Sequence, residues 1–399
     1  MKRIALISLH TPTASNFRGA SALPYHLMAF HPDNVALEVW SFNLNGCTPE
    51  QIRKSETALG IKIHTVGRPS WFRYLSPAPV RLMLSRPVLG YLPLPENVRT
   101  EINSYLKDSE SALWIYGEDI ARMAKLFTGL PVVVSGPDCE AMYYHRMLAI
   151  KGVPTSVKSI FRYALMYHRY AVMTSRFPVG SEIKYHLVGD EDARFLRQLN
   201  PAADVRFIRH PHYDLSEQRR QSASDKDVLK ILVAGRYDVT MARAADEAFE
   251  AMKLLPDGTK QRYKITFLGK GWDDKAGMLK TAGYDVDIKG YVDDYAAEIS
   301  SHHIQLTPVA VGTGTKGKVL DAFANGLLVI GTPLALENIA VENGKECVVY
   351  RDGAELAGWL NRLAQEPSTI EEIARAGKEA VLREHDRRKI AREFFNLFE

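Results

Sequence analysis

The chain of 399 residues exceeds the size of one ordinary folded core, which predicts two domains of roughly 150–200 residues each. Its composition, with 46% hydrophobic and 25% charged residues, is that of a soluble globular protein, and no segment approaches the roughly 18 apolar residues that a membrane-spanning helix requires. A net charge of +4 is too small to indicate a nucleic-acid-binding protein, so we expect no nucleic-acid partner.

The three cysteines, Cys47, Cys139 and Cys347, lie far apart and have no metal-ligand spacing. Their odd number argues against a disulfide framework and favours a reducing compartment. The apolar run that follows the basic start is only about five residues long, which is too short for a secretory signal and is typical of a strand. We therefore expect a cytoplasmic protein.

The first half of the chain alternates short apolar runs with segments of helical spacing. A glycine turn followed by a helix is predicted over residues 17–30. Such alternation is typical of a parallel sheet covered by helices. Strands are predicted at residues 2–9, 36–43, 62–67, 112–117 and 131–138.

A polar stretch over residues 212–227 predicts a linker, after which the alternation restarts. The tail over residues 369–398 has helical patterning throughout. We expect an α/β protein with two doubly wound domains, residues 1–213 and 214–375, and a terminal helix at 376–399. Further strands are predicted at residues 229–236, 263–271, 285–292, 304–311 and 327–332, with helices at 242–255 and 316–326.

The stretch 307–333, TPVAVGTGTKGKVLDAFANGLLVIGTP, places glycines, threonines and lysines between a strand and a helix. Ligands of parallel sheets bind beyond the carboxyl ends of strands, and a helix N-terminus attracts phosphate. Lys318 and Asp321 share one helical face, so a cation for a phosphate and a carboxylate for sugar hydroxyls lie together. The alternative is a glycine-rich turn with two solvated lysines.

Three more predicted strands end in loops with similar chemistry. Gly235 and Arg236 follow the first strand of the second domain, and an arginine offers a planar fork of donors to phosphate. The alternative partner of Arg236 is Asp238. Gly269 follows the next strand, and residues 289–294 follow the third, so that four loops at one sheet edge favour a ligand site.

These motifs resemble the donor domain of GT-B glycosyltransferases, especially family 4, also called glycosyl transferases group 1. The segments VAGR, LGKG, KGYVDD and the glycine-rich stretch occur in the family's order within residues 231–333. The first half resembles the family only in layout. The resemblance implies two Rossmann-like domains facing a cleft, with the C-terminal helix crossing back to the first domain.

The resemblance also implies roles for single residues. Lys318 and Arg236 match residues that contact the donor phosphates, and Asp321 stands where the family has a glutamate that holds the ribose hydroxyls. The loop 312–315 would approach the diphosphate or the sugar. The residues thereby assigned to donor binding are Gly235, Arg236, Gly269, Tyr291, Val292, Gly312, Thr313, Gly314, Thr315, Lys316, Lys318 and Asp321; Tyr291 and Val292 match the segment whose backbone contacts the nucleobase.

The sequence departs from the family at the catalytic positions. Retaining members of family 4 carry two glutamates with the spacing of Thr313 and Asp321, so the stereochemical outcome is open. Asp138 follows a predicted strand of the first domain and resembles the general base of inverting bacterial polysaccharide glycosyltransferases. The alternative is that Asp138 caps the following helix.

Two basic segments, 68–92 and 158–176, mix cations with aromatic and aliphatic residues. Residues 57–95 contain five Lys or Arg and no acid, and residues 151–176 repeat that count. Such mixtures suit an anionic membrane surface, where lipid-linked acceptors lie. The alternative is an ordinary domain face with buried aromatics and solvated arginines.

We expect a hexosyltransferase that moves a sugar from a UDP- or GDP-sugar to a hydroxyl of a glycan or lipid-linked glycan, in the synthesis of bacterial surface polysaccharide or glycoconjugate. No metal and no cofactor is expected, because no Asp-x-Asp follows a predicted strand and basic groups can neutralise the leaving diphosphate. A non-catalytic nucleotide-sugar-binding module, a same-fold epimerase and a phosphorylase are the alternatives. The apolar face near Phe394 is assigned to the crossing helix or to a dimer contact.

Overall fold

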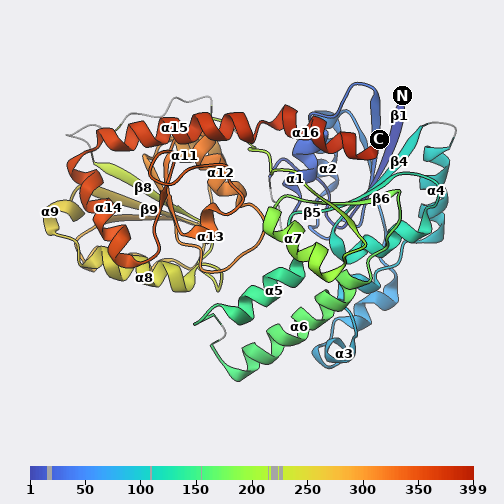
Figure 1. Ribbon diagram of the computed structural model, residues 1–399, viewed down its shortest axis with the longest axis horizontal. Coiled ribbons are helices and arrows are strands. Elements are labelled where there is room, and N and C mark those ends of the chain that lie inside the picture. Colours follow the sequence, from blue (N-terminus) through green and yellow to red (C-terminus); the bar gives the residue numbers. More distant parts are fainter. Residues whose placement is uncertain (16–19, 108–109, 154, 214, 217–222, 224–227) are drawn as a thin grey trace. The chain divides into compact units, whose positions relative to one another are not determined.

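The chain folds into two compact units (Figure 1). The computed structural model describes residues 1–15, 20–107, 110–153, 155–213, 215–216, 223 and 228–399. Unit 1 comprises Met1–His145, Ser156–Pro211 and Arg387–Glu399, and unit 2 comprises Arg146–Thr155 and His212–Asp386. Residues 17–19 of the predicted first turn and most of the predicted linker lie outside the described residues.

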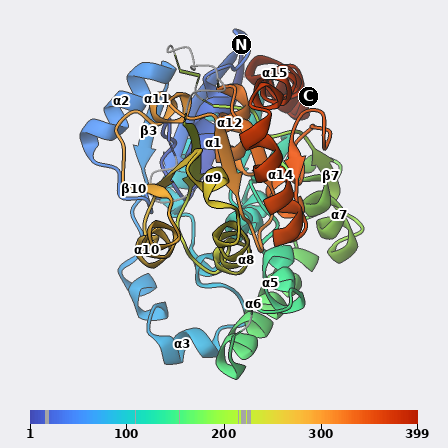
Figure 2. The same ribbon diagram turned by 90° about the vertical axis from the view of Figure 1, so that its left-hand side faces the viewer.

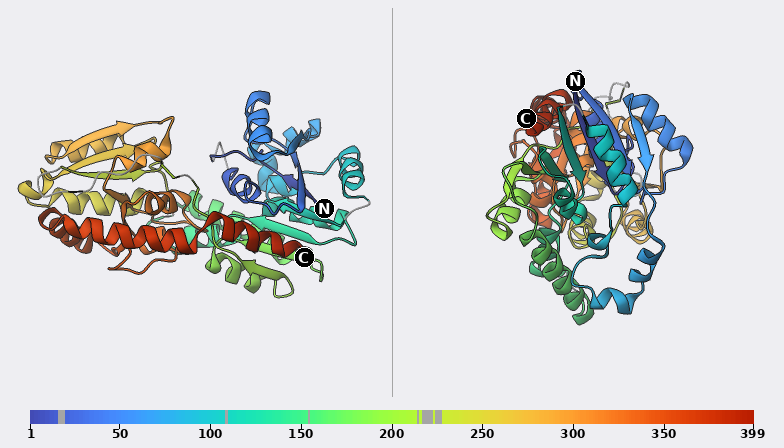
Figure 3. Two further views of the ribbon diagram at one scale, coloured as in Figure 1. Left: turned by 90° about the horizontal axis from the view of Figure 1, so that it is seen from above. Right: turned by 90° about the vertical axis from the view of Figure 1, so that its right-hand side faces the viewer.

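Unit 1 is built on a parallel sheet that, in the described chain, has seven strands in the order β3-β2-β1-β4-β5-β6-β7. Its central strands are mostly apolar and buried, because helices cover both faces of the sheet (Figure 3). The strands are β1 Lys2–Ser8, β2 Val35–Ser41, β3 Lys62–Thr65, β4 Ser111–Tyr116, β5 Val132–Gly136, β6 Ile183–Leu187 and β7 Asp204–Phe207.

The helices of unit 1 begin and end where the local sequence dictates. In α2, Thr48 and Gln51 form a capping box, Pro49 opens the helix and Gly60 closes it in the left-handed conformation. The helical elements are α1 Ala22–Met28, α2 Pro49–Leu59, η1 Ser70–Leu75, α3 Ala78–Met83, η2 Val88–Tyr91, α4 Glu96–Leu106, η3 Glu118–Leu126, α5 Glu140–Ala149, α6 Val157–Ser175 and α7 Asp190–Leu199; the last four residues of α5 belong to unit 2.

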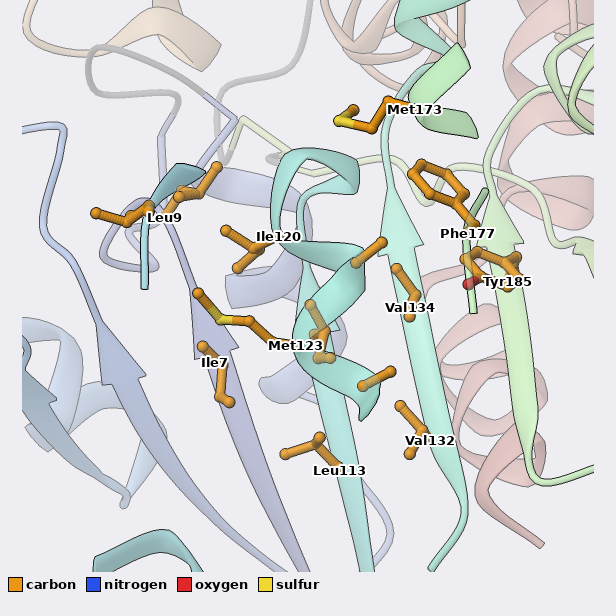
Figure 4. Packing of buried hydrophobic residues seen from close by; sticks show 14 of the residues in the cluster. Ile7, Leu9, Leu113, Ile120, Met123, Val132, Val134, Met173, Phe177 and Tyr185 are labelled. Carbon is orange, nitrogen blue, oxygen red and sulfur yellow. The ribbon is translucent and has the colours of Figure 1, made fainter. Parts of the chain in front are cut away.

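One face of the unit 1 core lies beneath η3 (Figure 4). Ile7 of β1, Leu113 of β4 and Val134 of β5 present their side chains to this element. Ile120 and Met123 of η3 point back toward the sheet and are fully buried. This packing fixes the start of η3, and with it Glu118 and Asp119, close to the carboxyl ends of β4 and β5.

Unit 2 is a second parallel sheet, with six strands among the described residues in the order β10-β9-β8-β11-β12-β13. The chain runs outward from β8 to β10 and then returns to β11, so the strand order reverses between β8 and β11. Such a switch point is where open α/β sheets bind ligands. The strands are β8 Leu229–Ala234, β9 Tyr263–Leu268, β10 Asp285–Lys289, β11 Ile304–Thr307, β12 Leu328–Gly331 and β13 Val348–Val349.

The helices of unit 2 follow the expected alternation with the strands. The helix after the glycine-rich loop is eight residues long, and six of its side chains are buried against the sheet. The helices are α8 Ala242–Lys253, α9 Asp257–Lys260, α10 Asp273–Thr281, α11 Tyr295–Ser300, α12 Gly317–Ala324, α13 Pro333–Leu336, α14 Gly353–Gln365 and α15 Ser368–Glu384.

The C-terminal segment returns to unit 1. The tail was expected to be helical throughout, which is wrong in one detail: α15 ends at Glu384, and α16 (Arg387–Phe395) begins after a break. The break is stabilised by His385, whose buried ring accepts a hydrogen bond from the Ala340 N–H at 3.1 Å. The expected boundary at residue 376 lies within α15, whereas the part of the tail that belongs to unit 1 starts at Arg387.

Aromatic side chains fasten α16 and the final turn η4 (Asn396–Phe398) to unit 1. The Phe394 ring lies 4.7 Å from the Trp114 ring and 5.6 Å from the Phe398 ring, centroid to centroid. Lys2 Nζ donates to the Phe398 carbonyl at 2.6 Å, so both chain ends lie together (Figure 3). The predicted return of the terminal helix is confirmed, and its aromatic face is buried within one chain.

We expect Phe394→Ala to lower the free energy of unfolding by about 3–5 kcal/mol, because a large buried ring leaves a cavity beside Trp114. Urea denaturation followed by tryptophan fluorescence measures the change. Glu393→Ala, at an exposed neighbouring position, is the control and should differ from the parent chain by less than about 0.5 kcal/mol. Equal midpoints for both variants would contradict the packing role of α16.

Candidate functional site

Two glycine loops touch at the carboxyl edge of the unit 2 sheet. Gly235 follows β8 with φ +138° and Gly269 follows β9 with φ +141°, a backbone region that side chains disfavour. A Cβ atom on Gly269 would lie 2.0 Å from the Gly235 carbonyl oxygen, so only glycine fits there. The Gly235 N–H donates to the Leu268 carbonyl at 2.9 Å, which fixes the register of the two loops.

The loop after β11 is tied to the same edge. The Ala310 and Val311 N–H groups donate to the Thr240 carbonyl at 2.7 and 3.1 Å. The Asp238 carboxylate accepts the Thr240 N–H at 2.9 Å and is therefore engaged within its own turn. Arg236 is exposed, and no side-chain partner for its guanidinium occurs in the part of the chain that the structure describes. The expected alternative, an Arg236–Asp238 pair, is not formed.

Cations hold the carbonyl groups of the glycine-rich loop between β11 and α12. Arg146 Nη1 donates to the Gly312 carbonyl at 2.7 Å. Lys316 Nζ donates to the Thr313 and Gly314 carbonyls at 2.9 and 3.1 Å. The Lys316 ammonium group, assigned from the sequence to donor binding, therefore stabilises the loop itself.

The N–H groups of the same peptide units point away from the side chains that bind the carbonyls. Asn338 Nδ2 donates to the Gly314 carbonyl at 3.1 Å, so the carbonyls of residues 312–314 all accept hydrogen bonds from side chains. The C=O and N–H of a trans peptide point in opposite directions, so the N–H groups of residues 313–315 point away from these donors. Gly314 has the left-handed conformation, at φ +60°, a backbone geometry that also occurs in loops whose consecutive N–H groups bind anions.

Sequence reasoning missed the ion pair between Arg146 and Glu337. Both guanidinium Nη atoms lie 2.7 Å from the two carboxylate oxygens, and both side chains are largely shielded from solvent. The bidentate geometry orients Arg146 toward the Gly312 carbonyl. The two residues are 191 positions apart, and no local pattern could have paired them.

Lys318 and Asp321 lie on the first turns of α12. The Lys318 ammonium group lies 5.7 Å from the centre of the Tyr295 ring. Burial lowers the pKa of Lys318, and the nearby Asp321 charge partly offsets this, although the Lys318 side chain keeps an exposed portion. The buried Asp321 carboxylate accepts the Tyr213 N–H at 3.2 Å. Asp321 therefore also fastens the chain that enters unit 2.

Two buried polar atoms beneath α12 have no hydrogen-bond partner among the described residues: Gln305 Oε1 and the Tyr295 hydroxyl. Gln305 Nε2 donates to the Lys318 carbonyl at 3.4 Å, which places the amide beside this turn. Burial, followed by the Asp321 charge, raises the pKa of Tyr295. Buried polar groups normally have partners, so a polar ligand or water is the expected complement here. The sequence had no signal for either residue.

The outer strand β10 ends in an exposed aromatic residue. Tyr291 is 80% exposed, and Val292 packs partly against a core cluster that contains Leu268. An aromatic ring presented at the sheet edge can stack on a base. The position matches the segment assigned from the sequence to the nucleobase.

Asp138 lies in unit 1, between β5 and the start of α5. Near the start of α5, the Cys139 N–H donates to Asp192 at 2.8 Å and the Glu140 N–H donates to Glu118 at 3.0 Å. Burial raises the pKa of Glu140 to about 8, and the charge of Asp138 adds to this shift. In the described parts of both units, no three His, Cys, Asp or Glu side chains are arranged to hold a metal ion.

Comparison with known proteins finds a family model that matches part of the chain and solved structures that share its fold. Residues 243–396, which include the glycine-rich loop and α12, match the family model described as glycosyl transferase-like. No curated protein sequence matches the chain significantly. Sucrose-phosphate synthase from Thermosynechococcus elongatus has a similar structure, with a TM-score of 0.64, 13% sequence identity, and coverage of 100% of this chain and 98% of that one. The chain has the GT-B fold.

Two further solved structures extend the similarity. HepE from Anabaena, solved in complex with UDP-glucose, has a TM-score of 0.64, 12% identity, and coverage of 99% of this chain and 98% of that one. WaaG, a glycosyltransferase involved in lipopolysaccharide biosynthesis, has a TM-score of 0.61, 12% identity, and coverage of 100% and 99%. The resemblance to GT-B glycosyltransferases expected from the sequence is confirmed, by the fold of the whole chain and by the family of its C-terminal region.

The raised pKa of Glu140 predicts a pH-dependent stability. The unfolded chain loses this proton near pH 4.5 and the folded chain near pH 8, so the free energy of unfolding falls as pH rises between these values. We expect Glu140→Gln to reduce the slope of the free energy of unfolding against pH by up to about 1.4 kcal/mol per pH unit. Urea denaturation at several pH values measures it, with the exposed Glu393→Gln as control. An unchanged slope in Glu140→Gln would refute the assignment.

Proposed function

We propose that this protein is a glycosyltransferase that moves a sugar from a nucleotide-diphosphate sugar to an acceptor hydroxyl. The observation that carries the proposal is the glycine-rich loop, whose carbonyls are held by Arg146, Lys316 and Asn338 while its N–H groups point the other way. This loop leads into α12, whose N-terminus adds further N–H groups and a positive dipole. The match of residues 243–396 to a glycosyl transferase-like family supports the same reaction class.

Departure of a nucleoside diphosphate creates negative charge on the leaving oxygen. Groups that are already oriented toward this charge stabilise the transition state without reorganisation. In our proposal the N–H groups of residues 313–315 receive the diphosphate, and the cations of Arg236 and Lys318 neutralise it. Fixed protein charges thereby perform the task that a divalent cation performs in other transferases, and we propose that the reaction needs no metal.

We propose a UDP-sugar as the donor. HepE, which shares the fold, was solved with UDP and with UDP-glucose. The exposed ring of Tyr291 offers a stacking surface for the base, and Val292 provides the backbone beside it. We assign Asp321 to the ribose hydroxyls, through the carboxylate that also binds the Tyr213 N–H.

Asp138 is our candidate for the base that removes the acceptor proton. It follows a central strand at the carboxyl edge of unit 1, where open sheets place their ligands. The acceptor is proposed to be a hydroxyl of a glycan or of a lipid-linked glycan at the cytoplasmic side of a bacterial membrane.

Arg236→Ala and Lys318→Ala should each weaken UDP binding by about tenfold or more, because each removes a charge-assisted contact to a phosphate. Isothermal calorimetry with UDP measures the affinity, and release of UDP from UDP-sugars in the presence of a cell extract measures turnover. Lys280→Ala, an exposed lysine elsewhere on unit 2, should leave the affinity unchanged.

The same assays separate binding from chemistry. Asp138→Asn should keep UDP affinity within about twofold and lose transfer by a factor of 100 or more, since general base catalysis contributes about 10²–10⁴. UDP affinity that survives both cation substitutions would refute the donor site. Binding without any UDP release would identify a binding module instead of an enzyme.

Turnover should persist in excess EDTA at more than about half of its original rate, since protein cations and N–H groups stabilise the leaving diphosphate. The measurement is UDP release after the protein and the substrates have been stripped of metal. Restoration of a lost rate by Mg²⁺ or Mn²⁺ would contradict the metal-independent mechanism.

A further inference from the structure

Helix α3 in unit 1 contains no buried residue and ends in two exposed apolar side chains. None of its residues, Ala78–Met83, is buried, and Met83 is 87% exposed. A surface helix of a globular protein normally packs an apolar face on the core. Leu82 and Met83 at the end of α3 therefore form an exposed apolar tip, which no described residue of unit 1 covers.

The start of α6 has the same character. Val157 is 83% exposed, and Ile160 and Phe161 are also exposed, whereas Tyr170 and Met173 near the other end are buried. The helix is thus anchored in unit 1 by its second half and extends its first turns into solvent. A Ser156–Ser159 capping box at this end orders those turns.

These elements form one surface, which we call the α3–α6 face: the exposed residues of η1, α3 and the first turns of α6. Arg169 Nη2 of α6 donates to the Leu82 carbonyl at 2.9 Å, which ties the end of α3 to α6. Figures 1 and 2 show α3 beside α6 at the lower end of unit 1. Trp71 and Tyr74 of η1 add exposed aromatic rings.

The charge of this face has a single sign. Residues 57–95 and residues 151–176 each carry five Lys or Arg and no acid. The exposed cations of the face are Arg73, Arg81, Lys158 and Arg162, and the exposed Arg68 lies just before η1. None of them forms an ion pair with a described residue. A second copy of the chain would place cations against cations across a two-fold interface, which disfavours self-association.

We infer that the α3–α6 face docks on a bilayer that contains anionic lipids. The cations would lie at the headgroups, and the tips Leu82, Met83 and Phe161 would enter the interface together with Trp71. Among the described residues no helix is both long and apolar enough to span a membrane, so contact through a surface is the mode that this structure offers. The lipid-linked nature of the acceptor rests on the proposed function, whereas the docking itself does not.

Vesicle co-sedimentation of the full chain tests the docking without any donor. Vesicles of phosphatidylcholine with about 30 mol% phosphatidylglycerol should bind the chain at least tenfold more tightly than pure phosphatidylcholine vesicles, and high salt should weaken the binding. Equal binding to both vesicles, or binding to neither, would overturn the proposal.

Matched variants test whether the α3–α6 face is the surface that binds the vesicles. Leu82→Ser with Met83→Ser should reduce binding about tenfold, because these side chains are the apolar tip. The control is Leu254→Ser in unit 2, a leucine that is 86% exposed, against 59% for Leu82 and 87% for Met83, and this variant should bind like the parent chain. Identical vesicle binding of both variants would refute this surface, and unchanged thermal midpoints verify that each variant is folded.

Charge reversal at two cations of the α3–α6 face is the second part of the vesicle test. Arg81→Glu with Lys158→Glu should abolish the preference for phosphatidylglycerol, while Lys280→Glu in unit 2 should retain it. UDP affinity, measured without vesicles, should be the same in all of these variants, so failure of the docking and failure of the donor site are told apart. A concentration-dependent dimer that the Glu variants disrupt would assign the face to a second copy and contradict the proposal.

Discussion

The contact between the Gly235 carbonyl and Gly269 is the constraint on which the carboxyl edge of the unit 2 sheet depends. The two backbones approach so closely that a single Cβ atom at Gly269 would overlap the oxygen. Trp272 closes the arrangement, since its indole N–H donates to the same Gly235 carbonyl at 2.9 Å. The loop after β8 is therefore held rigidly, and Thr240, which follows in this loop, accepts the N–H groups of the glycine-rich loop. Strand pairing alone would leave these loops free to move apart.

The glycine-rich loop combines backbone freedom with electrostatic anchoring. Gly314 supplies the left-handed conformation, and Lys316 folds back onto the carbonyls of its own loop. The Arg146–Glu337 pair adds a second cation on the carbonyl side. When the carbonyl oxygens of a loop already accept hydrogen bonds from cationic side chains, its N–H groups can bind an anion with little rearrangement of the backbone. The glycines make this segment flexible in the unfolded chain, whereas hydrogen bonds from Arg146 and Lys316 hold it in one conformation in the folded chain.

Local patterns predicted the alternation of strands and helices and the four loops at one sheet edge, because period and glycine placement are local properties. The Gly235–Gly269 contact follows from that prediction, since neighbouring parallel strands end side by side. The carbonyl partners could not be predicted: Arg146 lies far from Glu337 in the chain, and Lys316 was assigned to a ligand because nothing local shows that its side chain folds back. From the sequence, Asp321 was assigned only to the ribose hydroxyls of the donor. In the structure its carboxylate also accepts the Tyr213 backbone N–H. The break at His385 was missed because its ring is held by Ala340, a tertiary contact.

The return of α16 to unit 1 has a consequence for biosynthesis. Most of unit 2, His212–Asp386, lies between Pro211 and Arg387 of unit 1, so this stretch is translated before the last helix of unit 1. The nascent first unit lacks Phe394 and Phe398, which cover Trp114, until α16 and η4 have been translated. Domains made on the ribosome usually complete their folding from the N-terminus onward. In this chain, by contrast, Trp114 of the first unit can be covered only after most of the second unit has been synthesised.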